Sequence, residues 1–186
     1  YSKLLESICS KMKEIDSKHP IASVEAWTFG MDWWNEYVPS IDIYGLNAYG
    51  AGANFLQDEM NKKGIDKPYM ITEFGVTGEW DIEAEVNGVK VEPTDEEKYN
   101  AILNGYREWI LPKEICLGVF VFHYNDGNDF VSPWLFTHHD GKIRPQYWAI
   151  REAYTSQKPI NQVPNIQQFR LNQNSANGRD WVTVDM

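Results

Sequence analysis

Apolar residues recur along the chain with two periods, one helical and one extended. Residues 2–18 carry a stripe of apolar residues three or four positions apart, which is typical of an amphipathic helix. The stripe consists of Leu4, Leu5, Ile8, Met12 and Ile15. Residues 21–27 are short, apolar and bounded by polar segments, as expected for a strand. The same succession of helix and strand continues to about residue 154.

Three more strands and four more helices follow from this pattern. Local signals support several boundaries, because Gly64 is suited to end a helix and Thr94 with Glu97 forms a capping box. Before that capping box, Asn87-Gly88 is a typical two-residue hairpin turn. Helices and strands that alternate strictly predict a parallel sheet. We expect strands at 41–50, 69–74 and 116–124, and helices at 30–37, 53–63, 94–111 and 145–154.

Chain length limits what such a sheet can be. Four strands are half of the eight in a closed (β/α)8 barrel, which typically takes roughly 250 residues, and this chain has 186. Residues 1–156 therefore predict either a small open α/β domain or the second half of a barrel. Residues 157–186 are rich in Asn and Gln, and we interpret them as a linker followed by an incomplete β-rich segment that includes Trp181 to Val184.

The strand at 69–74 carries a carboxylate where an apolar strand would continue. Glu73 follows Ile71 and Thr72 and precedes Phe74 and Gly75. A carboxylate within an apolar run costs several kcal/mol unless it is paired or used. Glu73 is therefore either a strand end that reaches water or a functional group at the C-terminal end of a barrel strand, where barrel active sites lie.

Several motifs taken together resemble one family of enzymes. Asn47-Ala48-Tyr49 ends the second strand, KPYMITEFG (67–75) forms the third, and GVFVFHYND (118–126) forms the fourth, ahead of Phe136-Thr137 and a basic segment at 141–145. Over residues 2–154 the chain resembles the C-terminal half of a TIM barrel, strands five to eight with their helices, of a clan A retaining glycoside hydrolase. Glycoside hydrolase family 2 is the most similar, and family 5 is a near second.

The resemblance implies hydrolysis of β-glycosidic bonds by a retaining double displacement. It makes Glu73 the catalytic nucleophile, Tyr49 the catalytic tyrosine that contacts it, and Asn47 a substrate-binding residue. Phe122 stands where the family commonly has the Trp that floors the site of the reacting sugar, a departure that bears on sugar preference.

Alternation along the strands supports the same residues independently. Inward-facing positions of a barrel strand are two residues apart, and each of three such sets ends in a polar or aromatic residue at the C-terminal end of its strand. A Tyr49 hydroxyl that donates to Glu73 would hold that carboxylate ready to attack an anomeric carbon. The sets are Tyr69, Ile71 and Glu73; Gly45, Asn47 and Tyr49; and Phe120 and Phe122.

Two tryptophans are further candidates for substrate binding. Trp80 follows Glu73 closely, and Trp134 lies in the loop after the fourth strand. Either ring is expected to stack on a neighbouring sugar or to pack within its own loop.

A second carboxyl group is required about 5–5.5 Å from the nucleophile of a retaining enzyme. The family has it after an Asn at the end of strand four. Asn35-Glu36 follows strand five instead, and Glu25 is better explained as a salt-bridged or sugar-contacting side chain. We therefore expect the acid upstream of Tyr1, in an N-terminal half of the barrel missing from this sequence, and we expect these residues alone to be inactive.

Composition narrows the partners and the chemistry. With 27 acidic and 17 basic residues the net charge is −10, which argues against nucleic acid and anionic membranes and suits a neutral oligo- or polysaccharide. No run of 18 apolar residues is present, and Cys9 and Cys116 are expected to be free buried thiols. His138-His139 lacks the spacing of a metal site, and no Gly-rich phosphate loop follows a strand, so neither metal nor cofactor is expected.

Other functions stay open on the sequence. They are a non-catalytic carbohydrate-binding or scaffold fragment, an endo-β-glucanase or mannanase of the family 5 type, and an open α/β domain of another enzyme class. The last of these predicts that Glu73 and Tyr49 lie far apart. By the same resemblance, an appended β domain indicates a secreted or periplasmic protein that degrades polysaccharides.

Overall fold

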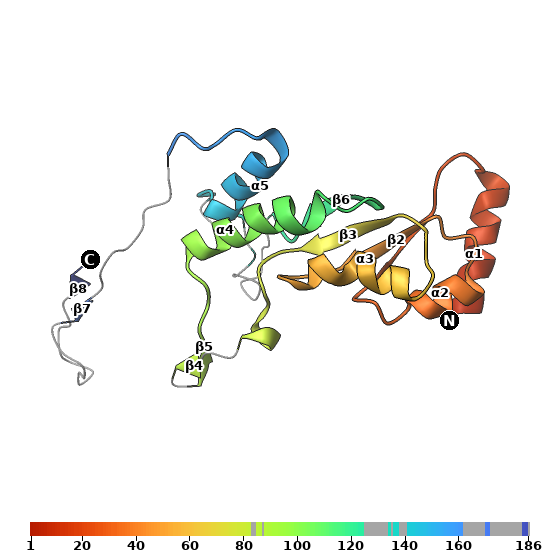
Figure 1. Ribbon diagram of the computed structural model, residues 1–186, viewed down its shortest axis with the longest axis horizontal. Helices are drawn as coiled ribbons and strands as arrows, with labels where there is room; N and C mark the ends of the chain where they lie inside the picture. The colour runs from red at the N-terminus through yellow and green to blue at the C-terminus, as the bar shows by residue number, and fades with distance from the viewer. Residues whose placement is uncertain are drawn as a thin grey trace.

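The computed structural model of the chain describes residues 1–82, 85–86, 88–124, 134, 136–137, 141–161, 170–171 and 184–185. Helices and strands alternate along it (Figure 1). The helices are α1 (Ser2–Ile15), α2 (Met31–Tyr37), α3 (Gly52–Lys62), α4 (Asp95–Gly105) and α5 (Pro145–Thr155). The strands of the main sheet are β1 (Ala22–Glu25), β2 (Ile43–Asn47), β3 (Tyr69–Phe74) and β6 (Cys116–Val121).

The main sheet has four strands in the order β1-β2-β3-β6, and every pair in it is parallel. This confirms the α/β class and the parallel sheet expected from strictly alternating elements. The carboxyl ends of the strands therefore meet at one edge of the sheet. β1 and β6 are the outer strands of this sheet.

Local sequence signals explain several element boundaries. The Thr94 side chain accepts a bond from the Glu97 backbone N–H, and the Glu97 side chain accepts from the Thr94 N–H, so the predicted capping box starts α4. Gly64 has a φ of +67°, which confirms it as the left-handed residue after α3. The predicted hairpin is also confirmed, with β4 (Glu85–Val86) antiparallel to β5 (Val89–Lys90). Helix α4 continues into a π-helical turn at Tyr106–Ile110.

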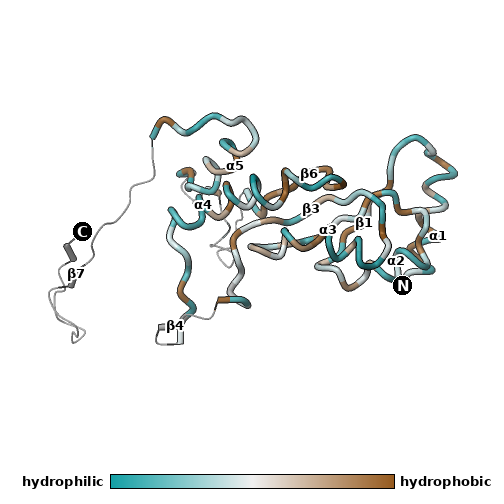
Figure 2. Tube along the Cα trace, in the orientation of Figure 1, coloured by the Kyte–Doolittle hydropathy of each residue, from teal (hydrophilic) through white to brown (hydrophobic). Residues whose placement is uncertain are grey.

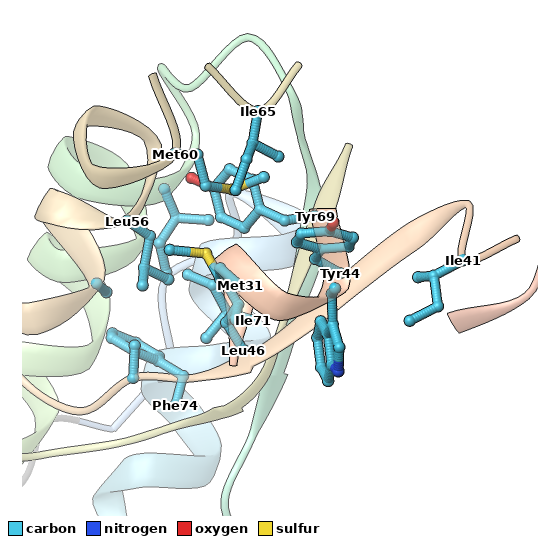
Figure 3. Close-up of a cluster of buried hydrophobic side chains, with 14 of the residues drawn as sticks. Met31, Ile41, Tyr44, Leu46, Leu56, Met60, Ile65, Tyr69, Ile71 and Phe74 are labelled. Atoms are coloured by element: carbon cyan, nitrogen blue, oxygen red, sulfur yellow. The ribbon is translucent and has the colours of Figure 1, made fainter. Parts of the chain in front are cut away.

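The core lies between one face of the sheet and the helices. Tyr44 and Leu46 of β2 pair with Tyr69 and Ile71 of β3, and all four are fully buried. Figure 3 shows these side chains beside Leu56 and Met60 of α3. The turns of α3 and α4 alternate between polar and apolar residues in Figure 2, as expected for helices with one buried side.

The opposite face of the sheet is not covered by the helices in the described part of the chain. Val24 of β1 is 54% exposed and Phe120 of β6 is 60% exposed. Gly45 lies between Val24 and Thr72 on this face, because a Cβ at Gly45 would approach the methyl groups of both. Parallel sheets are normally covered on both faces, so this apolar face, which we call the open face, is unusual.

The predicted shared face of Tyr69, Ile71 and Glu73 is wrong. Tyr69 and Ile71 are on the helix-covered face, and so is Phe74, which lies against Gly105 of α4. Ile71 and Phe74 are three positions apart, which simple alternation does not allow. The register between β2 and β3 shifts at this point, because Leu46 pairs with Ile71 but Asn47 pairs with Glu73. The irregularity returns Phe74 to the covered face and leaves Glu73 on the other one.

The C-terminal region contains one short antiparallel pair among its described residues. β7 (Arg170–Leu171) pairs with β8 (Val184–Asp185). Most of the strand predicted at 181–184 lies outside the described residues. Both thiols are free as predicted, and Cys9 is buried in α1. The expected burial of Cys116 is wrong, because this residue at the start of the outer strand β6 is only partly buried.

Candidate active site

The candidate site lies at the carboxyl ends of β2 and β3, where Asn47 and Glu73 are register partners. The two chains stay together beyond the strands, since the Ala48 N–H donates to the Glu73 carbonyl at 2.8 Å and the Gly50 N–H donates to the Gly75 carbonyl at 2.9 Å. This extension holds Tyr49 beside Glu73. We refer to Asn47, Tyr49, Thr72 and Glu73 as the carboxylate site.

A short hydrogen bond joins the tyrosine to the carboxylate. The Tyr49 hydroxyl donates to Glu73 Oε2 at 2.6 Å, and both side chains are partly buried. Burial, followed by this bond and the charge of Glu73, raises the pKa of Tyr49, so the phenol stays protonated and remains a donor. The open α/β alternative expected these two side chains far apart, and they are in contact.

A second hydrogen bond fixes the residue beside the carboxylate. The Thr72 hydroxyl donates to Asn47 Oδ1 at 2.8 Å. Gly45 makes room for Thr72, because a Cβ there would lie 3.0 Å from Thr72 Cγ2. Sequence reasoning did not select Thr72 as a site residue. The feature of the sequence that could have indicated Thr72 is its polar side chain directly before Glu73, in a strand that is otherwise apolar.

Three aromatic rings surround Tyr49. The Tyr49 ring centroid lies 5.5 Å from that of Trp80, 5.4 Å from that of Trp134 and 6.2 Å from that of Phe122. Trp80 stacks on Trp134 at 5.6 Å with an interplanar angle of 28°. The two tryptophans differ in exposure, since Trp80 is 61% exposed and Trp134 is only 8% exposed.

Trp134 is buried and is held by a hydrogen bond to the backbone. Its indole N–H donates to the Val76 carbonyl at 2.9 Å. A Cβ at Gly75 would come within 2.7 Å of the Trp134 ring, so glycine is needed directly after the strand that carries Glu73. Trp134 is therefore the buried ring of the cluster, whereas Trp80 presents much of its surface to solvent.

The other predicted carboxylates do not join the site. Glu25 ends β1, and its carboxylate lies against Gly30, because a Cβ at Gly30 would be 2.5 Å from Glu25 Oε2. Its register partner is Leu46, so Glu25 is on the helix-covered side of the sheet. Glu36 is exposed on α2. Neither side chain is a candidate partner for Glu73 in this arrangement.

The sequence also raised the questions of a metal site and a membrane-spanning helix. His138-His139 lies outside the described residues. Within the described ranges, no group of three His, Cys, Asp or Glu side chains could hold a metal ion. No helix among the described residues is long and apolar enough to cross a membrane.

Chemically, the carboxylate site can offer one carboxylate as nucleophile or base and one amide to a hydroxylated ligand.

Comparison with known proteins adds no assignment. Neither a protein-family model nor a curated protein sequence matches the chain.

Proposed function

We propose that this chain carries the nucleophile half of a retaining β-glycosidase, with Glu73 as the nucleophile. The observation that supports it best is the 2.6 Å bond from the Tyr49 hydroxyl to Glu73, at the carboxyl ends of adjacent parallel strands. That bond leaves the second carboxylate oxygen, Oε1, for the sugar. The end of the strands is also where active sites of parallel α/β barrels occur.

Two balanced steps complete the proposed reaction. In the first, a Glu73 oxygen bonds to the anomeric carbon while the glycosidic C–O bond breaks, and the leaving oxygen takes a proton from an acid carboxyl. In the second, water attacks the same carbon, returns a proton to that carboxylate and releases Glu73. No cofactor is required by either step.

Aromatic rings and an amide would bind the sugar. Trp80 is the exposed ring beside Tyr49 and is suited to stack on a neighbouring sugar unit. Phe122 contacts Tyr49 and Trp134 by its edge and would border the site of the reacting sugar. Asn47 would donate from its side-chain amide. Trp134 acts through the rings that it supports.

Three unpartnered surfaces favour half of a barrel over a complete open sheet. The first is the open face, and the second is the pair of outer strands, β1 and β6, each paired with one neighbouring strand in the described part of the chain. The third is the apolar stripe of α1, since Leu4 is 65% exposed and Ile15 is 80% exposed. An N-terminal half-barrel in the same polypeptide would cover all three and supply the acid carboxyl.

The test is covalent labelling of the natural full-length protein. A 2-deoxy-2-fluoro β-glycoside with a good leaving group traps the glycosyl–enzyme ester, and peptide mass spectrometry locates it. We expect the label on Glu73, and we expect Glu73→Gln to lose labelling and hydrolysis.

Glu25→Gln is the matched control, because Glu25 also ends a strand of the sheet but faces the helices. It should label and hydrolyse as the wild type does. A label on another carboxylate, together with an active Glu73→Gln variant, would overturn the assignment. Oligosaccharide binding without any hydrolysis would favour the non-catalytic alternative.

A further inference from the structure

The Asn47 side chain is oriented by a bond that has no part in the strand ladder. A hydroxyl that donates must meet an acceptor, and Asn47 offers Oδ1 to Thr72. The amide nitrogen, Nδ2, therefore points to the other side. It has no hydrogen-bond partner within the part of the chain that the structure describes.

Thr72 is itself held in place by packing. Its Cγ2 methyl lies over Gly45, where a side chain on Gly45 would collide with it. With the methyl directed onto β2, the hydroxyl is left facing Asn47. The order of contacts is thus Gly45, Thr72, Asn47, and each one limits the conformation of the next. The last member lies in register with Glu73.

We propose that Thr72 is a positioning residue that turns the Asn47 amide so that both Nδ2–H groups face the sugar bound at Glu73. This rests on the proposed glycosidase function. The ligand feature that it recognises is a hydroxyl oxygen close to the reacting carbon, which accepts from Nδ2. Thr72 touches no substrate, and it acts by preventing the amide flip that would present Oδ1 instead.

Steady-state kinetics of the natural full-length enzyme tests the role. Thr72→Val keeps the branched shape but removes the donor, and kcat/KM should fall about tenfold, the effect of one lost hydrogen bond of roughly 1.4 kcal/mol. Thr72→Ser keeps the donor but loses the methyl that fixes its direction, so kcat/KM should fall by less than in Thr72→Val. In an Asn47→Ala background, Thr72→Val should have no further effect, because the group that it positions is gone.

Substrate analogues separate positioning from general damage. Aryl glycosides that lack one hydroxyl at a time should include one on which the wild type and Thr72→Val are equally slow. That analogue identifies the hydroxyl bound by Asn47. Equal loss on every analogue, or a full additional loss in the Asn47→Ala background, would overturn the inference.

A spectroscopic readout is independent of catalysis. In protein labelled with 15N-asparagine, the Asn47 side-chain amide resonances should move in Thr72→Val and move less in Thr72→Ser, which keeps the donor. Resonances that do not move in Thr72→Val contradict the inference whether or not the protein hydrolyses glycosides. Moved resonances in a protein without hydrolysis keep Thr72 as the residue that orients Asn47 and remove the proposed glycosidase function instead.

Discussion

Replacing Tyr49 by Phe removes one hydroxyl from the carboxylate site and little else. The ring keeps its contacts with Trp80, Trp134 and Phe122, whose centroids lie 5.4 to 6.2 Å away. What is lost is the bond of 2.6 Å to Glu73. A carboxylate that no longer has this donor can rotate. In the proposed reaction, the negative charge that returns to it when the glycosyl ester breaks is then less stabilised.

The size of the effect follows from the kind of bond. A hydrogen bond to a charged group contributes about 1.5–3 kcal/mol, which corresponds to a fall of about 10- to 150-fold in rate. We expect this fall in kcat of the natural full-length protein on an aryl β-glycoside whose second step is rate-limiting. The free energy of unfolding, measured with urea, should fall by no more than about 3 kcal/mol, because the ring packing is kept.

Tyr44→Phe is the control for this prediction. Tyr44 is also on β2 and is fully buried, but its hydroxyl has no partner among the described residues. Burial alone raises the pKa of Tyr44 to about 12. Removing this hydroxyl should leave kcat unchanged and raise the free energy of unfolding by about 1 kcal/mol. If Tyr49→Phe behaves like Tyr44→Phe while Glu73→Gln is inactive, Tyr49 does not position the nucleophile.

Three further predictions concern the rings and the helix layer. Trp80→Ala should raise KM for a disaccharide about 2- to 12-fold, since ring stacking contributes about 0.5–1.5 kcal/mol, and should leave KM for a simple aryl glycoside unchanged in parallel assays. Gly75→Ala should lower the free energy of unfolding by about 1–3 kcal/mol, measured in urea, because a Cβ there would lie 2.7 Å from Trp134. The pKa of buried Glu152 is lowered, first by the Tyr99 hydroxyl and then by Arg107. A lowered carboxyl pKa stabilises the fold above the ordinary value of 4.5, and this stability is lost as pH falls through the folded pKa. Urea unfolding between pH 7 and pH 3 should therefore depend less on pH in Glu152→Gln, and an unchanged slope would contradict the role of Glu152.

Much of the fold was predictable because its signals are local. The capping box of Thr94 and Glu97 involves residues three positions apart, and both bonds form as expected. Gly64 and Gly88 also act within a few residues, because both have a positive φ that other residues adopt at a cost. The parallel sheet followed from the order of elements, which leaves few ways to connect the strands.

The face of the sheet on which the Glu73 side chain lies was not predictable from local signals. Strict alternation put it on one face with Tyr69 and Ile71, and the structure has those two residues under the helices. The shift of register after Leu46 depends on how β2 and β3 pair, and no pattern within either strand records it. Glu73 was selected because it interrupts an apolar strand and Tyr49 because of the resemblance, and the structure brings these two side chains into contact. Thr72 was missed because its role depends on Asn47, which is 25 positions away.

The apolar stripe of α1 connects the sequence pattern to the proposal for the whole protein. The sequence predicted it from Leu4, Ile8 and Met12, and an amphipathic helix normally buries such a stripe. In the structure the adjacent side of α1 packs inward, with Cys9 buried and Leu5 against the core, whereas Ile8 is 48% exposed and Met12 is 49% exposed. Helix α1 thus has apolar residues on two sides, and only one of these sides packs against the rest of the described structure. Such a pattern is expected of a helix with neighbours on both sides, as in the outer ring of a closed barrel. The exposed stripe and the outer strand β1 lie at one end of the sheet, and the open face extends from there across it to β6. One neighbouring half-barrel would cover all three and supply the acid carboxyl that the proposed reaction requires.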